Sequence, residues 1–73
     1  MEKKIIEIIS KITKIPASDL EVRKDEKKLW DSLKHMEIVI SLEDEFDITF
    51  ENEDIANANT VSAVIQIVKN KAE

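Results

Sequence analysis

Asp31, Ser32 and His35 are the residues whose types and spacing could support chemistry. A serine near a histidine suggests nucleophilic catalysis, because a histidine can act as the base that activates a serine hydroxyl. Such a site also needs an oxyanion hole and a concave pocket, and a chain of 73 residues has little room for either. His35 follows Ser32 on the same predicted helix, so we interpret it as a surface residue beside the serine. We therefore predict no catalytic residue and no enzyme.

Asp31 and Ser32 also stand where a helix would begin. Both are strong N-cap residues, because their side-chain oxygen can accept a hydrogen bond from a free N–H group of the first helical turn. A bare Asp-Ser-Leu string most often serves only as a cap. The elements around it must decide whether Ser32 does more.

The composition excludes several other kinds of site. The chain has no cysteine, no glycine and a single histidine, so it lacks a thiolate or zinc site and a Gly-rich phosphate loop. No apolar run approaches transmembrane length, and the start Met-Glu-Lys-Lys is unlike a secretory leader. We expect a cytoplasmic protein with no metal site and no membrane contact. The net charge of −5 argues against nucleic-acid binding.

The charge is concentrated in one part of the chain. Residues 29–56 carry nine acidic side chains and one basic one, whereas residues 1–28 and 57–73 are slightly positive. An acidic middle third is a candidate docking face for a basic partner. The alternative is an ordinary solvated helix face that keeps the protein soluble.

Apolar spacing predicts an all-α protein. Three main helices are expected over residues 2–14, 32–46 and 61–70, with a minor one over 51–56. The connection over residues 16–30 is long for a compact domain, and long loops tend to be functional. Ser18 and Glu21 fit a capping box, which predicts a single helical turn there. The whole, residues 1–73, is expected to be one domain.

Each predicted helix has an apolar face that should build the core. For the first helix the face is Ile5, Ile8, Ile9 and Ile12; for the second it is Leu33, Met36, Val39, Ile40 and Phe46, with Leu42 beside them; for the last it is Val61, Val64, Ile65 and Val68. Ile55 should face inward from the minor helix, and Val22, Leu29 and Trp30 should anchor the long loop.

The ends of the helices are also predictable. Proline disfavours helical geometry in the residue before it, so Ile15-Pro16 should end the first helix. Asp31 is the expected N-cap of the second helix, and Asp47 should end that helix in a left-handed conformation. Asn59 or Thr60 should cap the last helix.

The second predicted helix opens with Asp31-Ser32-Leu33 and ends with Leu42-Glu43-Asp44-Glu45-Phe46-Asp47-Ile48. A long first loop precedes this helix, and a short helix and then a helix that begins with Thr-Val follow it. In this order and length, the chain resembles the acyl carrier proteins over its whole extent. The tripeptide alone is weakly specific, but the combination is strongly specific.

The resemblance implies that Ser32 carries covalently attached 4′-phosphopantetheine. A phosphopantetheinyl transferase would move this group from coenzyme A to the serine hydroxyl, and its thiol would hold acyl or aminoacyl groups as thioesters. A phosphodiester there would lie at a helix N-terminus, where free N–H groups and the dipole favour negative charge. Asp31, as a family residue, would help organise a Mg²⁺ ion in the transferase complex besides capping the helix.

The same resemblance implies a recognition helix that meets basic patches on acyl- or aminoacyl-loading and acyl-processing enzymes. The residues expected there are Leu33, Met36, Glu37, Glu43, Asp44 and Glu45. Leu33 and Met36 could instead belong to the core. Trp30 is unusual, because a small residue commonly precedes Asp-Ser-Leu in fatty-acid carriers, and its expected role is to pin the loop to the bundle.

A discrete carrier is expected, in a fatty-acid-like or a specialised pathway. Lys34 and His35 depart from the usual fatty-acid pattern and favour a specialised one, such as a polyketide-like or aminoacyl pathway. Peptidyl carriers fit less well, since they usually have glycines before the serine. The alternative function is an acidic helical interaction module that is never modified and binds a basic partner through residues 37–54. A monomer is expected in either case.

Overall fold

The computed structural model describes residues 2–72, and these residues contain five helices and no β-strand. The helices are α1 (Glu2–Thr13), α2 (Ala17–Val22), α3 (Ser32–Phe46), α4 (Asn52–Asn57) and α5 (Val61–Ala72). The predicted all-helical class with three main helices is confirmed. The difference is α2, a short helix of six residues where the sequence predicts a single turn.

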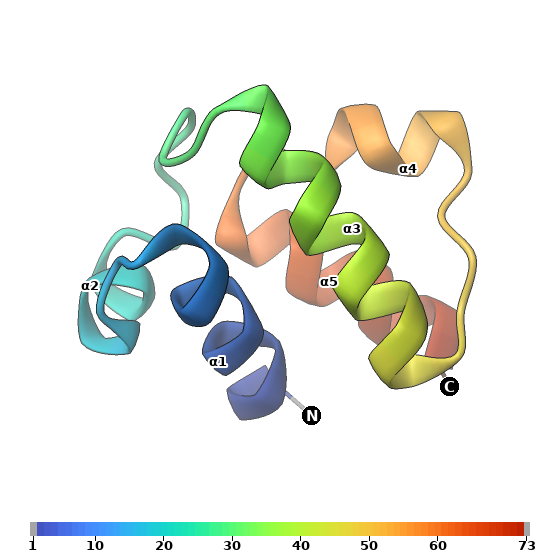
Figure 1. Ribbon diagram of the computed structural model, residues 1–73, viewed down its shortest axis with the longest axis horizontal. Coiled ribbons are helices and arrows are strands. Elements are labelled where there is room, and N and C mark those ends of the chain that lie inside the picture. The colour runs from blue at the N-terminus through green and yellow to red at the C-terminus, as the bar shows by residue number, and fades with distance from the viewer. Residues whose placement is uncertain (1, 73) are drawn as a thin grey trace.

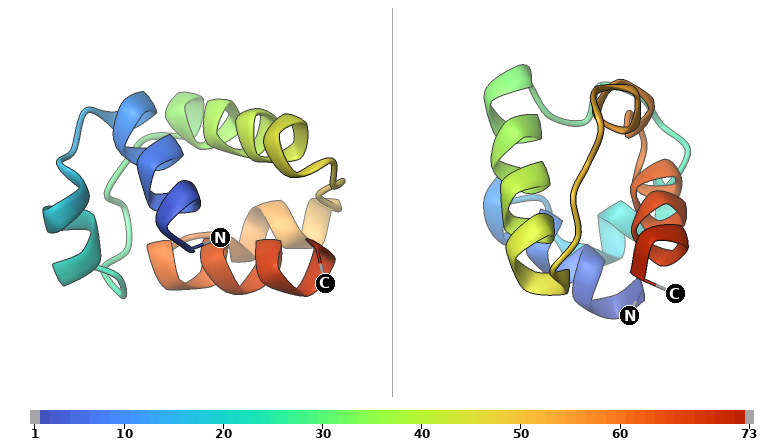
Figure 2. Two further views of the ribbon diagram at one scale, coloured as in Figure 1. Left: turned by 90° about the horizontal axis from the view of Figure 1, so that it is seen from below. Right: turned by 90° about the vertical axis from the view of Figure 1, so that its right-hand side faces the viewer.

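The three long helices form the bundle, and α1 packs against both α3 and α5 (Figure 1). The short helix α2 lies against α1, and α4 lies at the edge between α3 and α5 (Figure 2). α1 begins and α5 ends at one end of the bundle, whereas α3 begins at the opposite end. Within residues 2–72, no helix is both long and apolar enough to cross a membrane.

The core is built almost wholly from aliphatic side chains, and no polar side chain is buried among the described residues. The predicted apolar face of α5 is confirmed, since all of its members are buried. On α1, Ile6 is buried in addition to Ile5 and Ile9, while Ile8 and Ile12 are only half-buried. The predicted inward direction of Ile55 is confirmed, because it packs against the core.

The predicted core face of α3 is partly wrong. Ile38, Val39 and Leu42 are the buried residues of this helix. Leu33 is 72% exposed and Ile40 is 60% exposed, and Met36 is exposed too, so none of these three is a core residue. The apolar residues of α3 span a wide arc of its circumference, and periodicity alone does not determine which stripe within that arc faces inward.

The long loop is anchored at fewer points than predicted. Leu29 and Trp30 pack against the core as expected, but Val22 is 86% exposed. Val22 lies two positions beyond Leu20, the buried residue of α2, and a two-residue step places side chains on nearly opposite sides of a helix. The predicted capping box at Ser18 does not form, because α2 begins directly after Pro16 without a side-chain cap.

The predicted ends of α3 and the start of α5 are confirmed. Asp31 accepts a hydrogen bond from the Lys34 N–H at 2.9 Å, and Asp47 is left-handed with φ 54° and ψ 52°. Thr60, one of the two predicted caps of α5, accepts from the Ala63 N–H at 3.0 Å. Lys14, with φ 68°, ends α1 one residue earlier than predicted.

Ion pairs join elements that lie far apart in the sequence. The Lys71 ammonium lies 2.8 Å from an Asp54 carboxylate oxygen and so joins α5 to α4. The Lys71 ammonium, together with the Glu51 N–H, holds the pKa of Asp54 below its ordinary value. Glu2 contacts Lys24 at 3.2 Å and Lys69 at 3.6 Å, and these cations likewise lower the pKa of Glu2.

The left-handed conformation of Asp47 predicts that Asp47→Gly stabilises the protein. Glycine adopts this conformation without a steric penalty, but it also raises the entropy of the unfolded chain, so the net gain should be about 0.5 kcal/mol. That gain corresponds to a rise of a few degrees in Tm. The matched control is Glu45→Gly, which lies inside the last turn of α3 and should lower Tm. A fall in Tm for Asp47→Gly contradicts the geometry.

The Asp54–Lys71 pair predicts a pH-dependent contribution to stability. Since the folded-state pKa of Asp54 is lowered, its contribution is present at neutral pH and is lost as the pH falls through that pKa, below the ordinary value of 3.8. Lys71→Met should therefore lower Tm at neutral pH, and the difference from the wild type should narrow in acid. Thermal melts between neutral pH and about pH 3 measure this.

The control for that experiment is Lys11→Met, which removes an exposed lysine of α1 that forms no ion pair within residues 2–72. Its Tm difference should not depend on pH. A Lys71→Met difference that stays constant down to acid would show that the ion pair contributes nothing to stability.

Candidate functional site

Ser32 is the first residue of α3, and its side chain is exposed. The chain reaches it through Asp31, whose extended backbone (φ −86°, ψ 177°) turns the loop into the helix. Within residues 2–72, the Ser32 hydroxyl makes no hydrogen bond, because Asp31 does the capping. The hydroxyl is therefore free for an enzyme to approach.

The first turn of α3 leaves backbone donors beside this hydroxyl. The Lys34 N–H donates to the Asp31 carboxylate, and the His35 N–H donates to the Asp31 carbonyl oxygen at 2.9 Å. The N–H groups of Ser32 and Leu33 have no partner in the part of the chain that the structure describes. With the dipole of a 15-residue helix behind them, they favour a negatively charged group attached here. A phosphodiester on Ser32 therefore fits the residues present.

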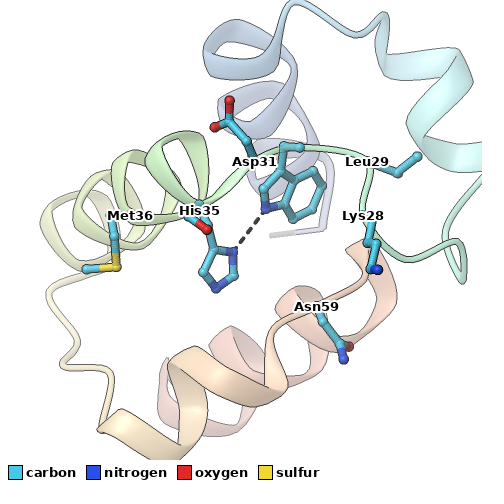
Figure 3. Close-up of a pocket in the computed structure, with 8 residues that line it drawn as sticks. Lys28, Leu29, Asp31, His35, Met36 and Asn59 are labelled. Carbon is cyan, nitrogen blue, oxygen red and sulfur yellow. Dashed lines mark hydrogen bonds between the residues drawn. The ribbon is translucent and has the colours of Figure 1, made fainter.

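Asp31 is exposed, and only its Oδ1 is used in the cap. Asp31 is among the residues that line the groove beside it, but its carboxylate points away from His35 and Asn59 (Figure 3). The second carboxylate oxygen thus remains open to solvent. Among residues 2–72, no three histidine, aspartate or glutamate side chains gather into a metal site.

His35 lies beside Ser32 in the lining of a groove, as expected, but it is half-buried and hydrogen-bonded on both ring nitrogens rather than a free surface side chain. Trp30 Nε1 lies 3.0 Å from His35 Nδ1, and His35 Nε2 lies 2.8 Å from the Ile55 carbonyl oxygen. An indole N–H can only donate, so Nδ1 must be the accepting nitrogen and Nε2 must carry the proton that bonds to Ile55. His35 is thus held as one neutral tautomer and ties the loop and α3 to α4.

A groove of about 280 Å³ opens beside Ser32. His35 and Met36 lie on one side of it and Lys28 and Asn59 on the other (Figure 3). Leu29, Trp30, Asp31 and Ser32 line it between these two sides, from the end of the long loop to the start of α3. The expected role of Trp30 is confirmed, since it packs against the core and pins the loop to α3 through His35.

The residues expected to meet partner enzymes lie in three different situations. Leu33, Met36, Glu37, Asp44 and Glu45 are exposed on α3. Glu37 lies 3.6 Å from Lys34, which offsets part of its charge. Glu43 is half-buried, and its Oε2 accepts a hydrogen bond from the Phe50 N–H at 2.7 Å, so it holds the connector between α3 and α4.

Sequence reasoning missed the pairing of Trp30 with His35, the bond from Glu43 to Phe50, and the position of Asn59 in the groove. The first two join a helix to non-helical chain, where no periodicity applies. An unusual tryptophan directly before the Asp-Ser-Leu string was the one available signal.

Comparisons with known proteins agree with this geometry. A family model described as "Phosphopantetheine attachment site" matches residues 3–68. An acyl carrier protein of Buchnera aphidicola subsp. Schizaphis graminum is 37% identical over 73 residues, covering 97% of this chain and 92% of that protein. An acyl carrier protein of Exiguobacterium sp. is 49% identical over 41 residues, covering 56% of this chain and 52% of that protein. The chain therefore belongs to the phosphopantetheine-attachment family, among the acyl carrier proteins.

Proposed function

We propose that Ser32 is the residue that carries 4′-phosphopantetheine, and that the thiol of this arm holds acyl or aminoacyl intermediates as thioesters for biosynthetic enzymes. The observation that carries the proposal is the exposed, unbonded Ser32 hydroxyl at the start of α3, beside two free backbone N–H groups. The family match supports phosphopantetheine as the cofactor, and the position of Ser32 at the start of α3 supports this serine as the attachment residue.

The attachment is a phosphoryl transfer to which this chain contributes only the nucleophile. A separate phosphopantetheinyl transferase would bring coenzyme A, and the Ser32 oxygen would form a bond to the phosphorus nearest the pantetheine. The bond from that phosphorus to the bridging oxygen of the diphosphate would break, and adenosine 3′,5′-bisphosphate would leave. The serine proton passes to a base of the transferase, because His35 has its basic nitrogen occupied by Trp30. The protein is therefore a substrate and a carrier rather than a catalyst.

Asp31 has room for two roles in this reaction. One carboxylate oxygen caps α3, which contributes on the order of 1 kcal/mol to stability. The other would be free to help hold a Mg²⁺ ion in the transferase complex. The two roles can be separated, since asparagine caps a helix as well as aspartate but removes the charge.

We expect intact mass spectrometry to show the gain of one phosphopantetheine after incubation with coenzyme A, Mg²⁺ and a broad-specificity transferase. Ser32→Ala should gain nothing, yet should unfold within about 0.5 kcal/mol of the wild type because the hydroxyl makes no hydrogen bond. Ser18→Ala, which removes another exposed serine in the first turn of a helix, should be modified as fast as the wild type.

Other outcomes have distinct meanings. Modification of Ser32→Ala would place the attachment at another residue. Failure of the wild type to be modified, with a working control carrier, would favour the alternative of an unmodified acidic module that binds a basic partner. Asp31→Asn should keep its Tm but react more slowly, and an unchanged rate would leave Asp31 only its capping role.

The exposed face of α3 is the proposed docking surface for the transferase and for the loading and processing enzymes. Leu33, Met36 and Ile40 follow helical spacing and leave an apolar stripe in solvent. Glu37 and Asp44 place negative charge along one edge of this stripe, and Glu45 adds a further negative charge towards the α1 side of the helix. A basic patch with a shallow apolar centre would complement it, and the charges would act mainly on the association rate.

We expect the double variant Asp44→Asn/Glu45→Gln to lower kcat/KM for modification by roughly three- to tenfold at low salt, with a smaller effect at high salt. Neither carboxylate forms an ion pair within residues 2–72, so folding should be unaffected. The matched control is Glu7→Gln/Glu21→Gln, which changes the net charge equally on α1 and α2. An equal effect in the control would show that only net charge matters.

The first turn of α3 bears on the pathway in which the carrier works. Lys34 pairs with Glu37 and makes the first turn of α3 less acidic than is usual for a fatty-acid carrier. This favours a discrete carrier in a specialised pathway, either polyketide-like or aminoacyl, over a fatty-acid-like one. Mass analysis of the native protein from its own cells would identify the thioester cargo directly.

A further inference from the structure

We propose that the flat surface formed by Trp30 and His35 is a binding site for the pantetheine arm and the first atoms of its thioester cargo. The proposal rests on attachment at Ser32. It goes beyond attachment because it states where the arm lies when no enzyme holds it. It also gives the two aromatic side chains a ligand-binding role beside their role in pinning the loop.

The two rings form one continuous surface. Their planes differ by 15°, their centroids are 6.3 Å apart, and the hydrogen bond between Trp30 Nε1 and His35 Nδ1 is 3.0 Å long. An indole N–H lies in the plane of its ring, so two nearly parallel rings joined through it must lie edge to edge rather than face to face. The result is a flat aromatic platform wider than either ring alone.

The platform is rigid and has no unmet polar group of its own. Trp30 packs against the core, and His35 Nε2 is held by the Ile55 carbonyl of α4. Both imidazole nitrogens and the indole nitrogen are already hydrogen-bonded within the protein. A ligand that lies on the rings therefore displaces only loosely held water and needs no rearrangement of the protein, which lowers the entropic cost of binding.

The remaining walls of the groove suit the chemistry of the arm. Pantetheine combines apolar carbons with two amide groups and is joined to the serine by a phosphodiester. Asn59 offers an exposed amide that has no side-chain hydrogen bond within residues 2–72 and can pair with an arm amide. Lys28 offers an ammonium that forms no ion pair among the described residues and can face the phosphodiester.

The point of attachment makes the arm the expected occupant. Ser32 itself lines the groove, so the arm would start inside it. Tethering converts binding into an intramolecular event with an effective concentration in the millimolar range, at which even a weak contact is populated. At about 280 Å³, the groove has room for a segment of the arm but not for a long chain beyond it.

The test uses Trp30, the only tryptophan in a chain without tyrosine, as its own probe. The unmodified protein, the pantetheinylated protein and its acetyl thioester are compared after intact mass has confirmed each form. We expect the acrylamide quenching constant of Trp30 to fall about twofold on pantetheinylation, as covering the exposed ring face half of the time would produce. We also expect nuclear Overhauser contacts between the indole protons and the two methyl groups of the arm.

Two variants serve as controls. Ser32→Ala treated with the same transferase should show no change in quenching. Trp30→Leu keeps an apolar anchor but removes the flat ring, and once circular dichroism shows that it is folded, its arm methyl groups should show faster motion in carbon relaxation than those of the wild type.

A confirmed mass gain with unchanged quenching and no indole contacts would overturn the proposal and leave attachment at Ser32 intact. Contacts from the arm to buried methyl groups between the helices, in place of the indole, would overturn it as well. Failure of the wild type to gain mass would instead overturn the attachment on which the proposal rests.

Discussion

The hydrogen bond from the Lys34 N–H to the Asp31 carboxylate fixes where α3 begins, and the position of each residue at the candidate site follows from that start. With Asp31 as the cap, Ser32 becomes the first helical residue and its hydroxyl stays free. His35 then lies about one turn further on, where it reaches both Trp30 and α4. With a start one residue later, Ser32 itself would be the cap residue and its hydroxyl would be used in capping instead of staying free.

The rest of the bundle positions α3 and acts on the candidate site only through that helix. The core beneath α3 consists of aliphatic side chains with no buried polar group among residues 2–72, so burial supplies stability but little directional preference. The relative orientation of the helices is set instead by a few polar contacts near the helix ends. Glu43 holds the Phe50 N–H, and Lys71 holds Asp54, which together fix the connector and α4 against the long helices.

Much of this arrangement could be predicted from the sequence, because the cues were local. The bounds of α3, the Asp31 cap, the left-handed Asp47 and the apolar stripe of α5 each depend on a few consecutive residues. The errors arose where the outcome depends on neighbours in space. The apolar residues of α3 span a wide arc, so only contact with α1 and α5 decides that Ile38 is buried and Ile40 is not. The Trp30–His35 bond likewise joins loop to helix, and no pattern within one element encodes it.

The placement of the ends of the helices has a practical consequence. Since α1 begins and α5 ends at the end of the bundle opposite the start of α3, a fusion partner, surface linker or affinity matrix joined beyond either helix would sit away from Ser32 (Figures 1 and 2). The two ends of the bundle therefore differ: one holds the start of α1 and the end of α5, and the other presents the candidate attachment serine. The protein can therefore be immobilised or fused between other domains while Ser32 stays accessible to an enzyme.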